Sequence, residues 1–487
     1  MIIDLAGTWQ LTFPERNDLK KKEIVLPGIL QAQNTGDAPG FDTNWQSSLH
    51  DPFWYEREEY QYEQNARCRI PFLSPMPRLC RGKAVYSRHF CIDEEDSRSY
   101  VLFLELTKWT TKVFLDGEEK GSYRSGCVPH IIKLGQIGPG EHELSLEIDN
   151  RCPAPYRPDG HMVSDALGAN WHGIGGRIEL ISYERMQAIQ DEKKAYADKH
   201  PAEIKVKNGN FILNGRPVFI RAAHFGGDFP LTGYPSTDPS IWRKIFRRIK
   251  EWGMNAMRFH SFCPPEAAFK AADEEGIMLL VECGMWNYFA PGIEMLEILR
   301  RESRRILRAF GHHPSFLFFS SGNEPEGPWY DVLRTWVRES KAYDEAIGYK
   351  GRRLYTAQSG WFYDTPPAET RGTDFLYFHR SGFGPIPGGS IRNEAGWKGR
   401  DYRVSLEDCD LPVMGHELGQ WCRYPDFSVI EKYAEKKALM RPDNFELFKA
   451  RAEEAGLLSL NQAMSEASAR QQLRLYKEDI EANLRTP

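Results

Sequence analysis

Two patterns in the sequence predict a multidomain protein of the β plus α/β class. Residues 1–183 contain short runs rich in β-branched and aromatic residues with no helix between them, which is typical of a β-sandwich or jelly roll. Residues 204–487 alternate strand and helix, which favours a TIM (β/α)8-type barrel over an open doubly wound sheet. A length of 487 residues suits two or three such domains.

Six runs of the first region have the composition of β-strands. They are GTWQLTF (7–13), AVYSRHFCI (84–92), YVLFLELT (100–107), TKVFLDGEEKGSY (111–123), HELSLEI (142–148) and RIELIS (177–182). Asp116-Gly117 lies inside the fourth run and predicts a hairpin turn. The polar stretch 184–203 that follows predicts a linker or a surface helix.

Seven runs of the second region predict the strands of the barrel. They are RPVFIRAA (216–223), NAMRF (255–259), IMLLVE (277–282), FLFFSS (316–321), RRLYTAQ (352–358), DFLYF (374–378) and LPVMGHE (411–417). No Gly-x-Gly-x-x-Gly follows any of them, which disfavours a dinucleotide fold. The stretch 443–484 is helical in pattern, so we expect a barrel without its eighth strand, incomplete at the C-terminus.

The helix after the first of these strands illustrates the pattern. Asp238-Pro239 is a helix-opening pair, and Gly253 ends the helix. Ile241, Ile245, Ile249 and Trp252 recur at helical spacing, so we expect them on its buried face.

Composition argues against several classes of partner. The net charge is −5 with no long like-charge run, so we expect no nucleic acid and no membrane partner. No window reaches the about 18 apolar residues of a membrane span, and MIIDLAGTWQLTF lacks the parts of a signal peptide. Nine scattered cysteines form no Cys-x-x-Cys pair, so we expect neither a disulfide frame nor a zinc site. We expect a cytoplasmic protein.

Polar side chains follow the predicted barrel strands, and the carboxyl ends of such strands are where the active site of a barrel enzyme lies. They are His224, Arg258, His260, Ser261, Glu282, Asn323, Glu324, His379, Arg380, His416 and Glu417. Since strand ends converge in a closed barrel, Glu324 and Glu417 should meet across one pocket. Two facing carboxylates are the groups that cleave a glycosidic bond, one as proton donor and the other at the anomeric carbon.

Each of these residues alone has a common structural use. A strand-end glutamate is often solvated or paired with an arginine such as Arg258. His260 and His416 suit ordinary polar packing. The aromatic residues Trp361, Trp397 and Trp421 suit either stacking on a sugar or filling a core. Only the presence of these residues together, at successive strand ends, indicates one particular function.

That combination resembles glycoside hydrolase family 2, the β-galactosidase, β-glucuronidase and β-mannosidase group. LAGTWQL (5–11) and NWHGIGGRIELIS (170–182) resemble the first and last strands of its sugar-binding jelly-roll domain. FILNGRPVFIRAAHF and WGMNAMRFHSFCPPEAAF resemble its first two barrel strands, HHPSFLFFSSGNEPEG its acid/base segment, and LPVMGHELGQW its nucleophile segment. The resemblance implies a jelly-roll sugar-binding-like domain at 1–183, a linker at 184–203 and a catalytic barrel at 204–487.

The resemblance also implies roles for individual residues. Glu324 matches the acid/base and Glu417 the nucleophile, Asn323 matches the residue that contacts the sugar 2-hydroxyl, and Arg258 matches the arginine that positions the nucleophile. We expect His224, His260, His379 and Trp421 to contact substrate. Burial and the charge of Glu417 should raise the pKa of Glu324. The two carboxyl groups should lie about 5–5.5 Å apart, as retention requires.

The implied activity is that of a retaining exo-acting β-glycosidase on a terminal β-linked sugar, with a β-galactoside as the default and glucuronide, mannoside or pentoside specificity as alternatives. This chemistry needs no organic cofactor; some relatives hold Mg²⁺ or Na⁺, and no ligand set here assigns either. Oligomeric state is not assigned.

Three features depart from the family pattern. The immunoglobulin-like domain between jelly roll and barrel is missing, and so is the eighth strand. His379 stands near the place of a family tyrosine, with Tyr377 two residues earlier. The first two departures favour one alternative, a non-catalytic carbohydrate-binding protein with a defective barrel. A barrel glycosidase of a neighbouring family, which cuts within polymers, is the other.

Overall fold

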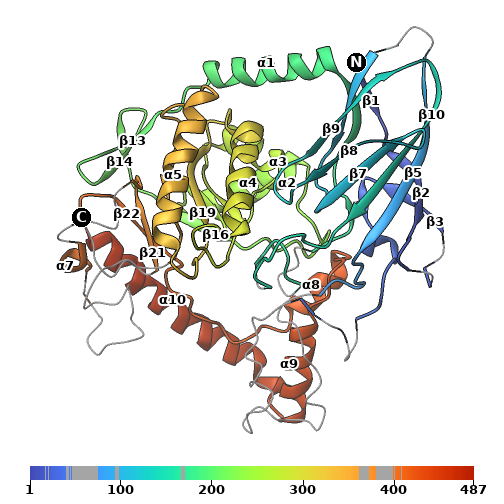
Figure 1. The fold of residues 1–487 in the computed structure, drawn as a ribbon. Coiled ribbons are helices and arrows are strands. Elements are labelled where there is room, and N and C mark those ends of the chain that lie inside the picture. The colour runs from blue at the N-terminus through green and yellow to red at the C-terminus, as the bar shows by residue number, and fades with distance from the viewer. Residues whose placement is uncertain are drawn as a thin grey trace.

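The computed structural model places β-sheets in the N-terminal part of the chain and parallel strands flanked by helices in the rest (Figure 1). It describes residues 1–16, 18–19, 21–39, 43, 45–46, 75–93, 98–158, 160–165, 170–360, 372–379, 399, 401–406 and 409–486.

Two antiparallel sheets make up the N-terminal part. One has the order β3 (Lys22–Leu26), β2 (Gly7–Thr12), β5 (Lys83–Ile92), β10 (Gly140–Asp149), β7 (Thr110–Leu115) and β8 (Glu118–Arg124). The other has the order β1 (Ile2–Asp4), β12 (Ile178–Ser182), β6 (Arg98–Leu104) and β9 (His130–Ile137). Their buried side chains, among them Trp9, Tyr86 and Leu102, form one core. Apolar residues alternate along these strands, as a half-buried strand requires.

The six strand runs expected in this part are all strands, and the predicted hairpin at Asp116-Gly117 joins β7 to β8. Both turn residues have positive φ, 52° at Asp116 and 80° at Gly117. This is the conformation that favours Asp-Gly in two-residue hairpins. Three strands, β1, β3 and β9, were not predicted. A two-stranded pair, β4 (Gly28–Ile29) with β11 (Gly173–Ile174), was not predicted either.

The polar stretch after β12 is a helix, α1 (Tyr183–Lys199), capped by the Ser182 hydroxyl, which accepts from the Arg185 N–H. It leads away from the N-terminal sheets along the top of Figure 1. A small antiparallel sheet follows, made of β13 (Ile204–Lys207), β14 (Asn210–Leu213) and β15 (Arg216–Val218).

Seven parallel strands follow in the predicted order. Five form one sheet, β16 (Ala222–Phe225), β17 (Ala256–Phe259), β18 (Met278–Met285), β19 (Phe316–Gly322) and β20 (Leu354–Thr356), and two form a pair, β21 (Leu376–His379) and β22 (Val413–His416). The helices between them are α2 (Pro239–Glu251), α3 (Glu266–Glu275), α4 (Glu294–Phe310), α5 (Trp329–Ala346) and α7 (Arg403–Leu406). Neighbouring strands of the five-stranded sheet are also consecutive in the sequence, whereas in a doubly wound sheet the spatial order reverses direction at one point. Closure into a barrel stays a prediction.

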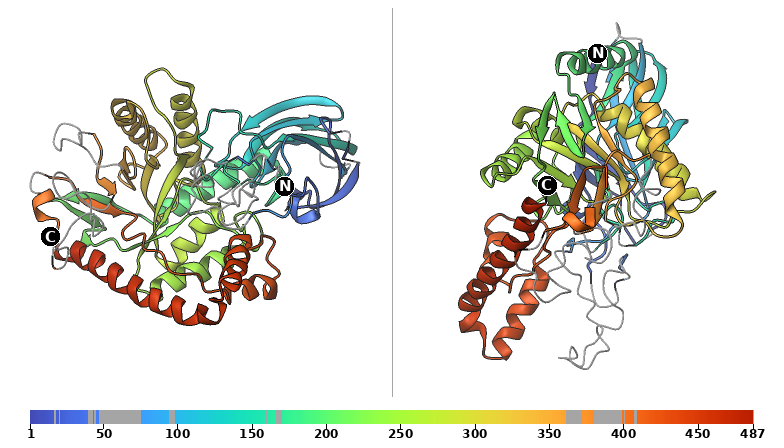
Figure 2. Two further views of the ribbon diagram at one scale, coloured as in Figure 1. Left: turned by 90° about the horizontal axis from the view of Figure 1, so that it is seen from below. Right: turned by 90° about the vertical axis from the view of Figure 1, so that its left-hand side faces the viewer.

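Helices occupy the chain after β22. They are α8 (Val429–Glu435), α9 (Asp443–Glu454), a 3₁₀ turn at Leu458–Leu460 and α10 (Asn461–Arg485). Residues 417–486, all of which the structure describes, contain no strand. The long helix α10 runs from the neighbourhood of α9 to that of β22 and α7 (Figure 2).

Two details of the predicted elements were wrong. The run expected as one strand at 216–223 is divided between β15 and the start of β16, because Pro217 belongs to the small antiparallel sheet, at whose edge a missing N–H is tolerated. The buried face of α2 was predicted only in part: Ile245 and Ile249 pack against the core as expected, but the face is centred on other residues. Trp242 and Phe246 are 1% and 0% exposed, whereas Ile241 and Trp252 are 41% and 76% exposed.

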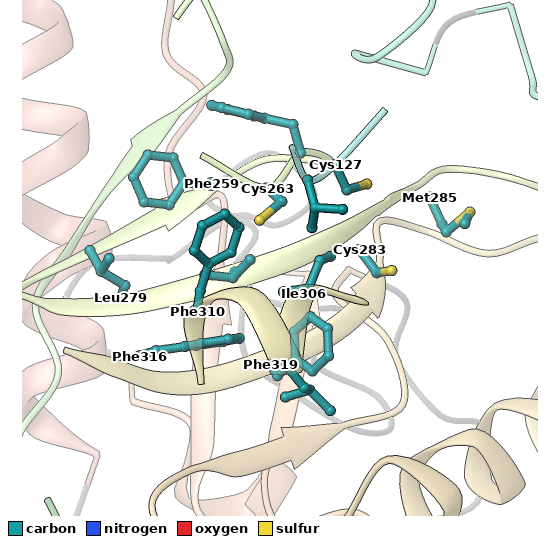
Figure 3. Close-up of a cluster of buried hydrophobic side chains, with 14 of the residues drawn as sticks. Cys127, Phe259, Cys263, Leu279, Cys283, Met285, Ile306, Phe310, Phe316 and Phe319 are labelled. Atoms are coloured by element: carbon teal, nitrogen blue, oxygen red, sulfur yellow. The ribbon is translucent and has the colours of Figure 1, made fainter. Parts of the chain in front are cut away.

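One hydrophobic core connects the N-terminal part with the parallel strands. It contains Phe259, Phe316 and Phe319 of the strands and Phe310 of α4, together with Cys127, which precedes β9. Figure 3 shows Cys127 among side chains of the parallel strands and α4. Because these side chains share one core, the sheets and the parallel strands are packed together in a fixed arrangement. Within the described residues, no helix is long and apolar enough to cross a membrane.

Candidate active site

The two glutamates singled out by the sequence follow the carboxyl ends of β19 and β22. The Asn323 N–H donates to the Met285 carbonyl at 2.8 Å and the Glu324 N–H to the Ser359 carbonyl at 2.7 Å, which fixes the loop after β19. Glu324 and Glu417 both have positive φ, 31° and 48°. Such values are uncommon for residues other than glycine and cluster at functional sites.

The Arg258 guanidinium, on β17, links its own strand to β18 and to the residues that follow β19 and β22. It donates to Glu282 Oε1 at 2.7 Å, to Glu417 Oε1 at 2.9 Å and to Asn323 Oδ1 at 2.8 Å, and the residue is only 1% exposed. The other oxygen of Glu282 accepts the Ser261 N–H at 2.7 Å. Arg258 therefore pairs with a buried carboxylate, as a structural arginine does, and with Glu417, the residue that the sequence suggested it positions. Its fixed fork of donors sets the position of Glu417 relative to Asn323.

The carboxylate of Glu417 has further neighbours on each oxygen. His416 Nε2 lies 3.5 Å from Oε1 and 3.1 Å from Asn323 Oδ1. The Gln420 amide donates to Oε2 at 2.6 Å. The negative charge of Glu417 is thus compensated by a guanidinium and bounded by polar groups.

Glu324 borders the same imidazole. A methyl group built at Gly360 would lie 2.5 Å from Glu324 Cγ and 3.3 Å from His416 Cε1, so these two side chains face one point. Burial and the negative charge of Glu417 raise the pKa of Glu324, while Arg258 acts in the opposite direction. Gly360 has a φ of 117° and leaves the room that Glu324 occupies.

Two predicted substrate contacts, His224 and His260, lie beside Glu417. His224 Nδ1 and His260 Nε2 are 4.0 and 3.9 Å from Glu417 Oε1. Desolvation by the surrounding protein and the Arg258 charge lower the pKa of His224 to about 4, although 42% of its side chain is exposed, and burial lowers the pKa of His260 well below its usual range. Both imidazoles are therefore neutral near pH 7. These three side chains could coordinate a metal. However, Arg258 Nη1 is 3.4 Å from His224 Nδ1 and would repel a cation there.

Several residues of the site were not assigned to it from the sequence. His161, from the connection between β10 and β11 of the N-terminal part, packs its ring 4.1 Å from that of His260, and burial lowers its pKa to about 3. Trp286 lies near the same two histidines and carries the Arg157 guanidinium on its face at 4.8 Å. No motif in the sequence marks His161, because its place depends on how the N-terminal part packs against the strands.

The remaining predicted residues are placed differently. The backbone of His379 pairs with His416 across β21 and β22, and its side chain lies outside the described residues. The Tyr377 ring is buried 5.4 Å from the Arg258 guanidinium and 5.1 Å from the His416 ring. The Trp421 indole donates to Asp479 of α10 at 2.7 Å, so this contact ties it to the C-terminal helix. Arg380, Trp361 and Trp397 lie outside the described residues.

The known proteins to which this chain is similar are named as glycosidases. No family model matches the chain. A β-galactosidase of Leuconostoc mesenteroides is 22% identical over 226 residues, 45% of this chain and 20% of that protein. The match therefore spans about a fifth of the length of that relative.

Solved β-glucuronidases share the fold. A structure from Ruminococcus gnavus, in complex with C6-substituted uronic isofagomine, has a TM-score of 0.59 at 15% identity and covers 92% of this chain and 89% of its own. An FMN-binding β-glucuronidase from Facaelibacterium prausnitzii L2-6 has a TM-score of 0.55 at 14% identity, with 78% and 67% coverage. The chain is thus similar to a β-galactosidase in part of its sequence and to β-glucuronidases in fold.

Proposed function

We propose that this protein is a retaining exo-acting β-glycosidase of glycoside hydrolase family 2 type, with Glu324 as acid/base and Glu417 as nucleophile. The observation that carries the proposal is the placement of two strand-end carboxylates beside one imidazole, that of His416. One of them is charge-compensated by Arg258 at 2.9 Å, and the pKa of the other is raised. Opposite environments for two carboxyl groups are what a double displacement needs.

In the first step, the Glu324 carboxylic acid gives its proton to the glycosidic oxygen as the Glu417 carboxylate attacks the anomeric carbon. The bond to the leaving alcohol breaks and a glycosyl ester on Glu417 forms. In the second step, Glu324, now a carboxylate, takes a proton from water, which attacks the anomeric carbon and releases Glu417. This sequence retains configuration and calls for carboxyl groups about 5–5.5 Å apart.

The surrounding residues support the two roles. Arg258 would keep Glu417 oriented for attack, and Asn323, which shares that guanidinium, would present its amide to the 2-hydroxyl of the sugar. Neutral His224 and His260 beside Glu417 would exchange hydrogen bonds with sugar hydroxyls. Tyr377 beneath Arg258 would take the place of the family tyrosine.

The substrate in this proposal is a terminal β-linked sugar. The relatives are named a β-galactosidase and β-glucuronidases, so β-galactosides and β-glucuronides come first, followed by β-mannosides and β-pentosides. The proposed architecture is an N-terminal jelly roll followed by a TIM (β/α)8-type barrel. One observation favours the non-catalytic alternative: residues 417–486 supply no strand after β22.

The test is an activity panel of aryl β-glycosides with wild type, Glu324→Ala and Glu417→Ala, each with and without azide. Both variants should lose turnover. Azide should restore product formation with a β-glycosyl azide from Glu324→Ala and an α-glycosyl azide from Glu417→Ala, because azide replaces water in one case and the nucleophile in the other. Sugar binding by wild type without turnover of any substrate would support the carbohydrate-binding alternative.

A further inference from the structure

A groove of about 1160 Å³ lies away from the proposed catalytic residues, between the N-terminal sheets and the helices α1, α3 and α4. Neither Glu324 nor Glu417 lines it. Its wall contains Glu266, at the start of α3, and His312 and His313, in the turn between α4 and β19.

These three side chains converge. Each offers one ligand atom, and the three atoms all lie within 4.8 Å of one another. Zn²⁺ binds histidine nitrogen and carboxylate oxygen at about 2.0–2.2 Å, so small side-chain movements would bring all three atoms onto one ion. A fourth position would face the groove and could take water.

The histidine nitrogens supply a second observation. His312 and His313 are 4% and 2% exposed, yet His312 Nδ1 and His313 Nε2 have no hydrogen-bond partner. Leaving a buried polar atom unpaired is unfavourable, so such atoms favour the binding of a partner such as a water or an ion. Both residues belong to the set that converges with Glu266.

Asp273 orients one of these rings. His313 Nδ1 lies 2.6 Å from Asp273 Oδ2, so the ring donates its N–H there and leaves the Nε2 lone pair available. A carboxylate that holds the far nitrogen of a histidine is the arrangement found behind metal-ligating histidines.

We propose that Glu266, His312 and His313 bind one divalent first-row transition-metal ion, with Zn²⁺ as the best-fitting member of the class. The ligand set of two imidazoles and one carboxylate suits such ions better than Mg²⁺ or Ca²⁺, which prefer oxygen ligands. The ion connects α3 to the turn before β19, the strand that precedes Glu324. The site stands independently of the proposed glycosidase activity.

Two cations form ion pairs with Glu266 and compete with the metal, and Lys193, which donates to the Ala309 carbonyl at 2.9 Å, adds a third positive charge near Glu266. Arg177 Nη2 and Lys270 Nζ lie 3.3 and 3.5 Å from Glu266 Oε2. The side chains of Arg177 and Lys270 are 48% and 52% exposed, so both can turn to solvent when the ion binds.

The test is titration of untagged, full-length protein with Zn²⁺ by calorimetry and with Co²⁺ by visible absorption. A Cys91→Ser/Cys422→Ser background removes the two exposed thiols of the described chain. We expect one bound ion, which Glu266→Gln and His312→Gln abolish and Asp273→Asn weakens by roughly 10–100-fold. His89→Gln, an exposed histidine 3.6 Å from Glu141, is the matched control and should leave binding unchanged.

Thermal unfolding without metal shows that each variant is folded before it is titrated. If His312→Gln does not fold, Glu266→Gln carries the test. Absence of binding at metal concentrations that saturate ordinary protein zinc sites would overturn the proposal. Binding that survives Glu266→Gln and His312→Gln but disappears in His224→Gln would overturn it as well, because the ion would then lie beside Glu417.

Discussion

The Arg258 side chain combines burial with three hydrogen-bonded partners, and this explains how a full positive charge is kept inside the protein. Glu282, 0% exposed, and Glu417 each accept one of its N–H groups, and Asn323 accepts a third. A buried charge is tolerated only when its partners satisfy it. The side chain that aligns Glu417 is therefore itself held rigidly.

Removing Arg258 should destabilise the fold as well as the site. Arg258→Met leaves Glu282 buried without its cation, which should cost about 3–5 kcal/mol of unfolding free energy. Urea unfolding followed by fluorescence measures the change. The control is Arg157→Met, whose pair with Glu326 is partly exposed and should contribute less than about 1 kcal/mol. Equal losses for the two variants would contradict this account of Arg258.

The raised pKa of Glu324 links activity and stability to pH. Because its ordinary pKa is 4.5 and folding raises it, the folded state binds this proton more tightly, and the stability that results is lost as pH rises through the folded value. Glu324→Gln should therefore unfold at a higher temperature than wild type at neutral pH, with the difference vanishing below about pH 4.5. Thermal scans from pH 4 to 8 measure it.

Glu324→Gln should also lower kcat by about 10²–10⁴-fold on substrates with poor leaving groups, because the substitution removes the proton donor. The alkaline limb of the wild-type pH–rate profile should reflect the raised pKa of Glu324. A variant with unchanged rate and unchanged stability would contradict the assignment of this residue.

At the scale of elements, the sequence was most informative where strands are buried and strand ends are polar. Uniformly buried runs such as Phe316–Gly322 follow directly from their composition, and Asn323 and Glu324 follow the strand as expected. Elements that depend on distant partners were harder. The short strand β1 pairs with β12, far along the chain, and no local pattern indicates that partner.

Helix α2 was predicted from the sequence, but the residues at the centre of its buried face were not. Its start and end follow from Asp238, whose carboxylate accepts the Ser240 N–H at 2.8 Å, and from Gly253. Two interleaved apolar stripes are compatible with its sequence. The one that includes Trp242 and Phe246 is buried because the aromatic side chains of the core surround Trp242.

A matched pair of tryptophans on this helix tests that orientation. Trp242→Ala should reduce the unfolding free energy by about 3–5 kcal/mol, because it opens a cavity in the core. Trp252→Ala, at a residue 76% exposed, should change it by less than about 0.5 kcal/mol. Denaturant unfolding of both variants measures the difference. A larger loss of unfolding free energy in Trp252→Ala than in Trp242→Ala would show that the face first expected is the buried one.

At the scale of the whole molecule, the site depends on packing that the sequence does not reveal. His161 reaches His260 because the N-terminal part and the parallel strands share a core that includes Cys127 and Phe310. Sequence patterns report which residues are buried but not which separate segments bury each other. The two candidate glutamates could be proposed without that knowledge, because the carboxyl ends of parallel strands lie at the same edge of the sheet.

The shared core also predicts how the protein unfolds. If the N-terminal sheets and the parallel strands bury apolar surface against each other, neither should survive the loss of the other. Differential scanning calorimetry should show a single main transition, and Trp109, at the shared core, should lose its buried environment in that transition. Two well-separated transitions would show that the parts unfold independently.

The most direct test of the central claim is to trap the covalent intermediate with 2-deoxy-2-fluoro aryl β-glycosides of the sugars that the protein turns over and to locate the label by peptide mass spectrometry. The proposal predicts one sugar per chain, attached to Glu417, with Glu417→Gln unlabelled. A label on another residue, or steady turnover with no label and an inverted product, would contradict it.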